Sequence, residues 1–207
     1  DSTWVPEGEE LLISRGVTVQ FDPGEGLYVY GTLNAIGEEE DSVHFTTNEE
    51  GEEWAGLYFY APRIEHEFEY CTIRNAVNGL VAYSQTYLSV ISSDINCSYI
   101  AFGVLNSNDH NQTNNRYYFE SSIIVGGRVT PFNSSSLTGI DSYFATGSDE
   151  QWGFTNRGSV ELTGCDFVGS MRSSSMRSVF RRCNFYRPEE AGCWIDVHGG
   201  SIQDCYV

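Results

Sequence analysis

The sequence predicts an all-β fold in which short parallel strands stack into a solenoid, and three observations predict it. A six-residue motif recurs along the chain: apolar, two polar or small residues, Cys or Ser, polar, apolar. Its copies are rich in β-branched and aromatic residues, which favour strands. Between the copies we find no amphipathic segment of helical length.

Seven copies of the motif set the period. Their Cys or Ser places are 71, 93, 122, 142, 165, 183 and 205, at intervals of 22, 29, 20, 23, 18 and 22 residues. A unit of this length holds two or three strands and can bury its apolar side only by stacking on its neighbours. The copies are FEYCTI (68–73), VISSDI (90–95), FESSII (119–124), the looser IDSYF (140–144), LTGCDF (162–167), FRRCNF (180–185) and IQDCYV (202–207).

Alternation inside a copy predicts which side chains face the core. In the first copy we expect Cys71 and Ile73 to point inward and Thr72 outward, as in a strand with one buried face. Because Cys and Ser share one place, a column of small inward side chains is expected. Free buried thiols are the favoured state of its cysteines, and a disulfide between coils about 4.8 Å apart is the alternative.

The first third of the chain also contains short strand-like segments. It contains VTVQFDPGEGLYVYGTLNAIG (17–37), VHFTT (43–47) and WAGLYFY (54–60). Together with the repeats, these segments resemble the right-handed parallel β-helix, or pectin-lyase-like, superfamily. We therefore expect a single β-helix domain over 1–207, with N-terminal coils in 1–67, regular coils in 68–207 and about eight coils in all. The resemblance implies no single activity, because the superfamily holds lyases, hydrolases, epimerases, adhesins and phage tailspikes.

Charge narrows the choice of partners. The chain has 29 acidic residues against 11 basic ones, all Arg, and a net charge of −18. Residues 1–70 hold 17 acidic residues and two Arg, whereas residues 151–207 hold six of each. Such a field repels nucleic acid and anionic membranes, and no apolar run is long enough to span a bilayer. Strong acidity without Lys resembles proteins from high-salt organisms.

The start of the chain lacks both Met and a signal-like segment. We therefore expect that a leader or upstream sequence was removed and that the protein is secreted or displayed on a surface. No capping segment follows IQDCYV at the other end. A longer parent protein or an end-to-end contact through this uncapped coil is expected, because an open coil exposes unpaired strand edges.

Function is expected on outward rows of side chains, because inward residues form the core. Outward polar and aromatic residues are also expected on a face that is merely exposed to solvent, and this alternative stays open. The row after the Cys or Ser place is Thr72, Asp94, Ile123, Tyr143, Asp166, Asn184 and Tyr206, and the row before it is Tyr70, Ser92, Ser121, Asp141, Gly164, Arg182 and Asp204.

Non-catalytic binding of a polysaccharide or cell-surface glycan is the leading hypothesis. Aromatic rings can stack on sugars while amide and charged groups bond to hydroxyls. The expected binding residues are Tyr143, Asn184, Tyr186 and Tyr206, with Trp152 and Trp194 as further aromatics. A purely structural role as a spacer or stalk is a separate alternative.

The enzymatic alternative is a polysaccharide lyase or a glycoside hydrolase. A hydrolase needs two carboxylates roughly 5–9.5 Å apart, and a lyase needs a base plus a cation or metal. The candidates are Asp141, Asp166, Arg182 and Asp204, but the acidic motifs of pectate lyases and polygalacturonases are missing. The acidic runs EEED (38–41) and EEGEE (49–53) make calcium a weak candidate, and no other metal or cofactor is expected.

Overall fold

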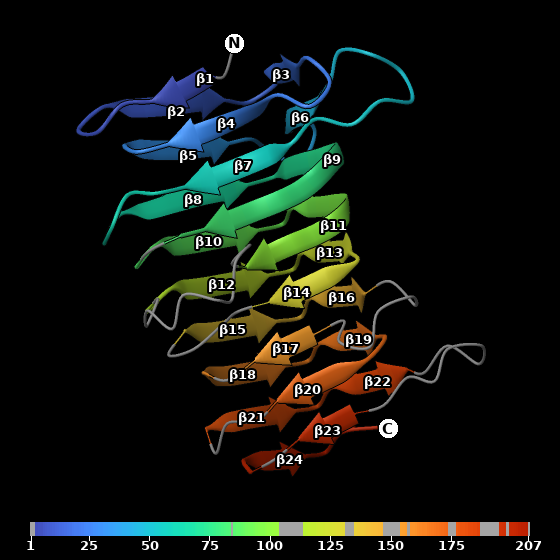
Figure 1. Cartoon of the computed structure of the whole chain (residues 1–207). Coiled ribbons are helices and arrows are strands. Elements are labelled where there is room, and N and C mark those ends of the chain that lie inside the picture. The colour runs from blue at the N-terminus through green and yellow to red at the C-terminus, as the bar shows by residue number, and fades with distance from the viewer. Residues whose placement is uncertain are drawn as a thin grey trace.

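The computed structural model describes residues 3–83, 85–103, 114–130, 135–146, 154–156, 158–173, 177–186, 195–197 and 199–206. The regular elements in these ranges are 24 strands, arranged in sheets of fifteen and nine strands. Every pairing between the strands is parallel. Figure 1 shows them stacked in chain order from β1 to β24. The expected all-β fold of parallel strands is confirmed.

The nine-stranded sheet takes one strand from each repeat, and its register confirms the predicted repeat alignment. It pairs Glu69, Ile91, Glu120, Ile140, Thr163, Arg181 and Gln203 in one row, with offsets of 22, 29, 20, 23, 18 and 22 residues. In order, its strands are β2 (Glu10–Ser14), β5 (Thr32–Ile36), β8 (Glu65–Glu69), β10 (Tyr87–Ile91), β12 (Arg116–Glu120), β15 (Ser136–Ile140), β18 (Ser159–Thr163), β21 (Ser178–Arg181) and β24 (Ser201–Gln203).

The fifteen-stranded sheet consists of two rows that share the long strands β9 (Cys71–Ala82) and β11 (Asp94–Gly103). The first row contains β3 (Thr18–Phe21), β6 (Val43–Thr47), β13 (Ile123–Gly126), β16 (Tyr143–Thr146), β19 (Asp166–Val168) and β22 (Asn184–Tyr186). The second row contains β1 (Thr3–Val5), β4 (Gly26–Val29), β7 (Gly56–Phe59), β14 (Arg128–Thr130), β17 (Phe154–Asn156), β20 (Met171–Ser173) and β23 (Ile195–Val197). Each regular repeat thus supplies three strand segments, one to each row of the structure.

The interior between the rows is filled by large apolar side chains. Trp54 is fully buried and stacks on Phe21 with ring centroids 4.3 Å apart. Further along, Phe119 lies between Phe102, at 4.5 Å, and Phe144, at 5.8 Å. Burying such rings is the main apolar contribution to stability in this type of core. Among the described residues, no helix has the length and apolarity needed to cross a membrane.

Each copy of the motif marks a corner between two strands, whereas the sequence analysis expected one continuous strand. In the first copy the buried residues Phe68 and Cys71 are three positions apart, and strict alternation would bury every second residue. A left-handed residue before the Cys or Ser place turns the chain from one sheet to the other. The φ angles are 48° at Tyr70, 48° at Ser92, 49° at Ser121, 46° at Asp141, 66° at Gly164, 51° at Arg182 and 52° at Asp204.

A ladder of side-chain hydrogen bonds fills the inside of this corner. The backbone N–H of Cys71 donates to Ser93 Oγ at 2.9 Å. The N–H of Ser93 donates to Ser122 Oγ, and that of Ser122 to Ser142 Oγ, both at 3.2 Å. Each of the three serine hydroxyls donates in turn to the carbonyl two residues earlier, at 2.8 Å. The inward residue must therefore be a small acceptor and not merely a small side chain.

Cysteines continue the ladder in the later copies. The backbone N–H of Cys183 donates to Cys205 Sγ at 3.4 Å. A hydrogen bond with Cys183, together with burial, raises the pKa of the Cys165 thiol. The expected free thiols are confirmed for the described cysteines, Cys71, Cys97, Cys165, Cys183 and Cys205, whereas Cys193 lies outside the described residues.

Replacing Ser122 with Ala should lower the free energy of unfolding by about 1–3 kcal/mol, because the buried N–H of Ser93 loses its acceptor. Ser122→Cys is the matched control, since Cys fills this place in other copies and keeps an acceptor. Urea unfolding followed by far-UV circular dichroism measures both variants. Equal losses for Ala and Cys would contradict the acceptor role.

His66 is a fully buried titratable residue in β8. The N–H of Leu33 donates to its Nδ1 at 3.1 Å, and its Nε2 has no hydrogen-bond partner among the described residues. Its ring packs against Phe59 with centroids 4.7 Å apart. Burial lowers the pKa of His66 from 6.5 to about 4, because charging the imidazole here would leave a cation in the core.

The free energy of unfolding should therefore depend on pH through His66. Between pH 6.5 and about 4 the unfolded chain binds the proton and the folded chain does not. Stability is thus fully present above pH 6.5 and falls by at most about 3 kcal/mol as pH drops toward 4. His66→Asn keeps an acceptor for Leu33 without titrating, so its urea midpoints should vary less over this range. An unchanged pH dependence in this variant would rule out His66 as the cause.

Candidate functional site

The strand row predicted to carry function is present with the expected register. Tyr143, Asp166 and Asn184 pair across β16, β19 and β22, and Tyr206 bridges to Asn184. Asn184 Nδ2 donates to Asp166 Oδ1 at 2.7 Å. Tyr206 and Tyr186 are exposed, at 70% and 45%. This face therefore brings a bonded Asp–Asn pair together with the tyrosines of its row.

Three of the four predicted catalytic residues lie elsewhere than expected. Asp141, Arg182 and Asp204 were expected on an outward strand row, but they are the exposed left-handed residues of the corners. In that column Gly164 stands between Asp141 and Arg182. Asp166 belongs to the neighbouring strand row. The left-handed turn is the reason for the difference, because it takes these residues out of strand alternation.

Several other charged side chains are paired. Arg181 bonds to Glu161 at 2.5 Å, and Arg15 bonds to Glu38 at 2.6 Å and lies 3.9 Å from Asp41. These contacts neutralise part of the 38–41 acidic run that was a weak calcium candidate. Over the described ranges, no group of three or more His, Cys, Asp or Glu residues is placed to hold a metal. Trp152, Arg187 and Trp194 lie outside the described residues.

A stack of five tyrosines, which the sequence analysis missed, covers the second row near the start of the chain. Tyr30 stacks on Tyr60 with centroids 4.9 Å apart and planes 16° apart, and Tyr60 on Tyr83 at 4.5 Å and 6°. Beside them Tyr28 stacks on Tyr58 at 5.1 Å and 15°. Parallel register repeats equivalent positions about every 4.8 Å, which is a stacking distance. We call these five residues the tyrosine ladder.

Strand alternation places the ladder on the outside. In β4, Leu27 and Val29 are buried in the core, so Tyr28 and the following Tyr30 point away from it. β7 repeats the pattern with Tyr58 and Tyr60, thirty residues later. Two Tyr-x-Tyr pairs one coil apart were the signal in the sequence. The signal was missed because the motif alignment began only at residue 68.

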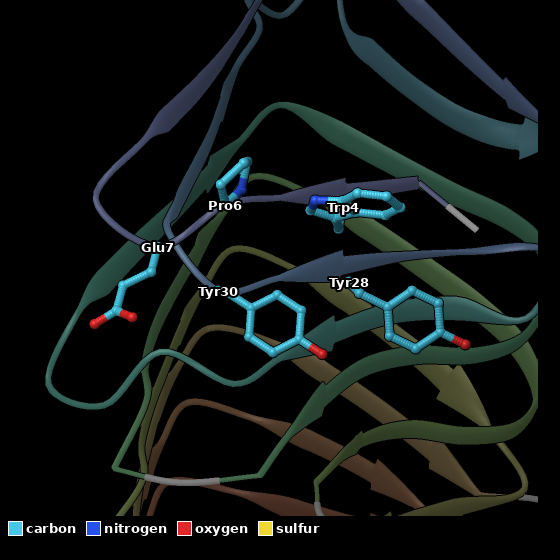
Figure 2. Close-up of a pocket in the computed structure, with 5 residues that line it drawn as sticks. All are labelled: Trp4, Pro6, Glu7, Tyr28 and Tyr30. Carbon is cyan, nitrogen blue, oxygen red and sulfur yellow. The ribbon is translucent and has the colours of Figure 1, made fainter. Parts of the chain in front are cut away.

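The tyrosine ladder ends at an open slot beside β1. The slot has a volume of ≈ 500 Å³ and is lined by Trp4, Pro6, Glu7, Tyr28 and Tyr30. Figure 2 shows Trp4 above Tyr28 and Pro6 above Tyr30, with Glu7 at the rim on the Tyr30 side and its carboxylate pointing away from the rings. Since Pro6 lies where a further ring would continue the stack, Tyr30 and Trp4 remain 44% and 63% exposed.

Backbone contacts fix the wall of the slot. The N–H of Glu9 donates to Pro6 O at 3.1 Å across a tight turn whose third residue, Gly8, has a φ of 79°. This turn presents Glu7 and rests on Gly31. A Cβ at Gly31 would lie 2.1 Å from Glu9 O and 2.3 Å from Pro6 O. Glycine is required here for close approach of two backbone segments.

Two phenols of the tyrosine ladder, those of Tyr58 and Tyr60, are held in the neutral form. Burial raises the pKa of Tyr58 and of Tyr60 above the ordinary value of 10.0. Tyr58 Oη donates to Ala55 O at 2.9 Å and accepts from Asn78 Nδ2 at 3.1 Å. The rings of Tyr58 and Tyr60 are therefore held in place, and they form a rigid backing for Tyr28 and Tyr30.

A second, smaller hollow of ≈ 190 Å³ has a polar lining. Its cation, Arg74, donates to Asp94 through both terminal nitrogens, with Nη1–Oδ1 at 2.9 Å. A paired guanidinium has less charge to offer a ligand. The lining residues are Glu53, Arg74, Asn75, Ala76, Asn96, Cys97 and Ser98. The slot, which is larger and walled by exposed rings, is the stronger candidate.

Comparisons of the chain with protein-family models, curated proteins and solved structures give no match. The assignment of a function therefore rests on the geometry of the slot.

Gly31→Ala should displace the Pro6–Glu9 turn, because its Cβ meets two backbone oxygens. Overpacking of this kind costs about 1–3 kcal/mol of unfolding free energy. Gly24→Ala is the control for the aromatic signal alone: a Cβ there meets nothing within 4 Å, but its φ of 75° strains Ala, so this variant also loses stability. Urea unfolding gives the stability, and near-UV circular dichroism reports on the stacked rings. A changed aromatic signal in Gly24→Ala, or none in Gly31→Ala, would contradict this account.

Proposed function

We propose that this chain is a non-catalytic carbohydrate-binding module and that the slot is its binding site. The observation that carries the proposal is a preformed ≈ 500 Å³ slot whose walls include the exposed rings of Trp4 and Tyr30. Such rings pack against the apolar faces of sugars, and hydroxyl and carboxylate groups at the rim bond to sugar hydroxyls. A few polar groups around an apolar slot are typical of small-ligand sites.

The tyrosine ladder supports binding by preorganising the slot. Tyr30 is backed by Tyr60 and Tyr83, and Tyr28 by Tyr58, in stacks with spacings of 4.5 to 5.1 Å. A ligand that stacks on Tyr30 orders few side chains that were free before binding. Preorganisation of this kind improves affinity by lowering the entropic cost of association.

The same geometry favours binding over catalysis. A glycoside hydrolase needs two carboxylates around the scissile bond, and the slot lining contains one, Glu7. The four candidates of the enzymatic alternative are divided between corner and strand columns, and Asp166 already accepts a hydrogen bond from Asn184. The exposed face with Tyr143, Asn184, Tyr186 and Tyr206 is proposed as a second contact surface for a long glycan.

For the fold and its setting we propose a right-handed parallel β-helix of about eight coils, akin to the pectin-lyase-like superfamily, in a secreted or surface-displayed protein. Support comes from the parallel rows, to each of which a regular repeat adds one strand segment. The net charge of −18 suits a module that must stay dispersed in an extracellular medium.

Tyr30→Ala should weaken binding of an N-acetylglucosamine oligomer, a neutral probe, by about tenfold, the effect of losing one aromatic anchor. Tyr99→Ala is the control, because Tyr99 is exposed but lies outside the slot. Isothermal titration calorimetry measures both, and Tyr186→Ala tests the second surface. Unchanged binding in Tyr30→Ala would refute the site. New reducing ends or unsaturated ends in the sugar would refute the non-catalytic assignment.

A further inference from the structure

We infer that the slot selects sugar units that carry a free amino group, as in a glucosamine polymer, over N-acetylated and acidic sugars. This selectivity rests on the proposed glycan binding and adds a ligand class to it. Three features of the slot support it: the charge at its rim, the ring faces on its walls and its size.

Among the described residues that line the slot, the charge is negative and no cation is present. Glu7 is the charged residue in the lining. Glu9 follows it in the same connection, and Glu10 is the first residue of β2. The two Arg of residues 1–70 are engaged elsewhere, Arg15 with Glu38 and Arg63 with Gln85 at 2.9 Å. An ammonium group at the rim would therefore meet a carboxylate without competition from an arginine.

The aromatic walls of the slot also attract an ammonium group. An ammonium within about 6 Å of a Trp or Tyr ring face gains roughly 0.5–1 kcal/mol at an exposed site. Trp4, Tyr28 and Tyr30 supply such faces. The surrounding third of the chain, with 17 acidic residues and two Arg, concentrates cations near the slot and repels uronates.

The size of the slot favours a sugar over a simple cation. Its volume of ≈ 500 Å³, part of it open to solvent, exceeds what a single ammonium or quaternary ammonium group fills. A sugar ring against Tyr30 with its amino group toward Glu7 uses both the apolar wall and the charged rim.

Titration of the intact chain with three oligomers of equal length tests the inference. The probes are glucosamine, N-acetylglucosamine and galacturonate oligomers, each at low and at high salt. The glucosamine oligomer should bind about tenfold more tightly than the N-acetylated one at low salt, and salt should narrow this gap because the attraction is screened. The galacturonate oligomer should not bind.

Two variants, each of which removes one negative charge, test whether the preference for the glucosamine oligomer arises at Glu7. Glu7→Gln should weaken binding of the glucosamine oligomer by about threefold, the size expected for an exposed ion pair, and leave the N-acetylated oligomer unaffected. Glu40→Gln is the matched control, because Glu40 is exposed in the β5–β6 connection and is not part of the slot lining. Equal losses in the two variants would reduce the effect to net charge and overturn the inference.

The outcomes separate this inference from the function on which it rests. Equal affinity for the glucosamine and N-acetylated oligomers, abolished by Tyr30→Ala, would overturn the amine selectivity and keep glycan binding. Choline binding as tight as that of the glucosamine oligomer would assign the slot to a simple cation and overturn the sugar class. Failure of every oligomer to bind would overturn glycan binding together with the inference.

Discussion

The corner hydrogen bond between one repeat and the next is the interaction on which the rest of this structure depends. A left-handed residue turns the chain between the sheets and leaves an inward N–H that bonds to a side chain of the following copy. Ser and Cys can accept this bond and also donate to the carbonyl two residues before them. An unsatisfied N–H at each buried corner would cost about 1–3 kcal/mol, so these corner hydrogen bonds favour the observed register of the strands in the motif copies from Cys71 onward.

The parallel register of the first strands, which precede the corner ladder, builds the candidate site. Once β4 and β7 are aligned in parallel, Tyr28 falls on Tyr58 and Tyr30 on Tyr60 without any further requirement. Stacking then continues to Tyr83 in the next coil. At the first coil the sequence changes to Pro6, and the missing ring opens the slot. A departure from the repeat, and not the repeat itself, creates the place where a ligand fits.

Charge and shape are combined at one end of the molecule. The acidic residues concentrate in the first 70 positions, where the tyrosine ladder begins. The arginines of the last coils are partly taken up by ion pairs such as Arg181–Glu161. The face of Tyr143, Asn184 and Tyr206 therefore differs from the slot in charge as well as in shape. Under the proposed function, these two surfaces would contact different parts of a long polymer.

The sequence by itself determined the strand content, the spacing of the repeats and the line of Cys and Ser, because alternation and period are local properties of the chain. It also placed Tyr143, Asp166, Asn184 and Tyr206 in one row. The tertiary structure decided that Asp141, Arg182 and Asp204 are corner residues, although the glycine at 164 in their column was a hint. It alone decided the slot, because only pairing of β1 with β4 brings Trp4, Pro6 and Glu7 beside Tyr28 and Tyr30. The strands β1 and β4 lie before the first aligned copy of the motif, so the repeat alignment gave no register for them, and only the folded structure shows which of their side chains meet.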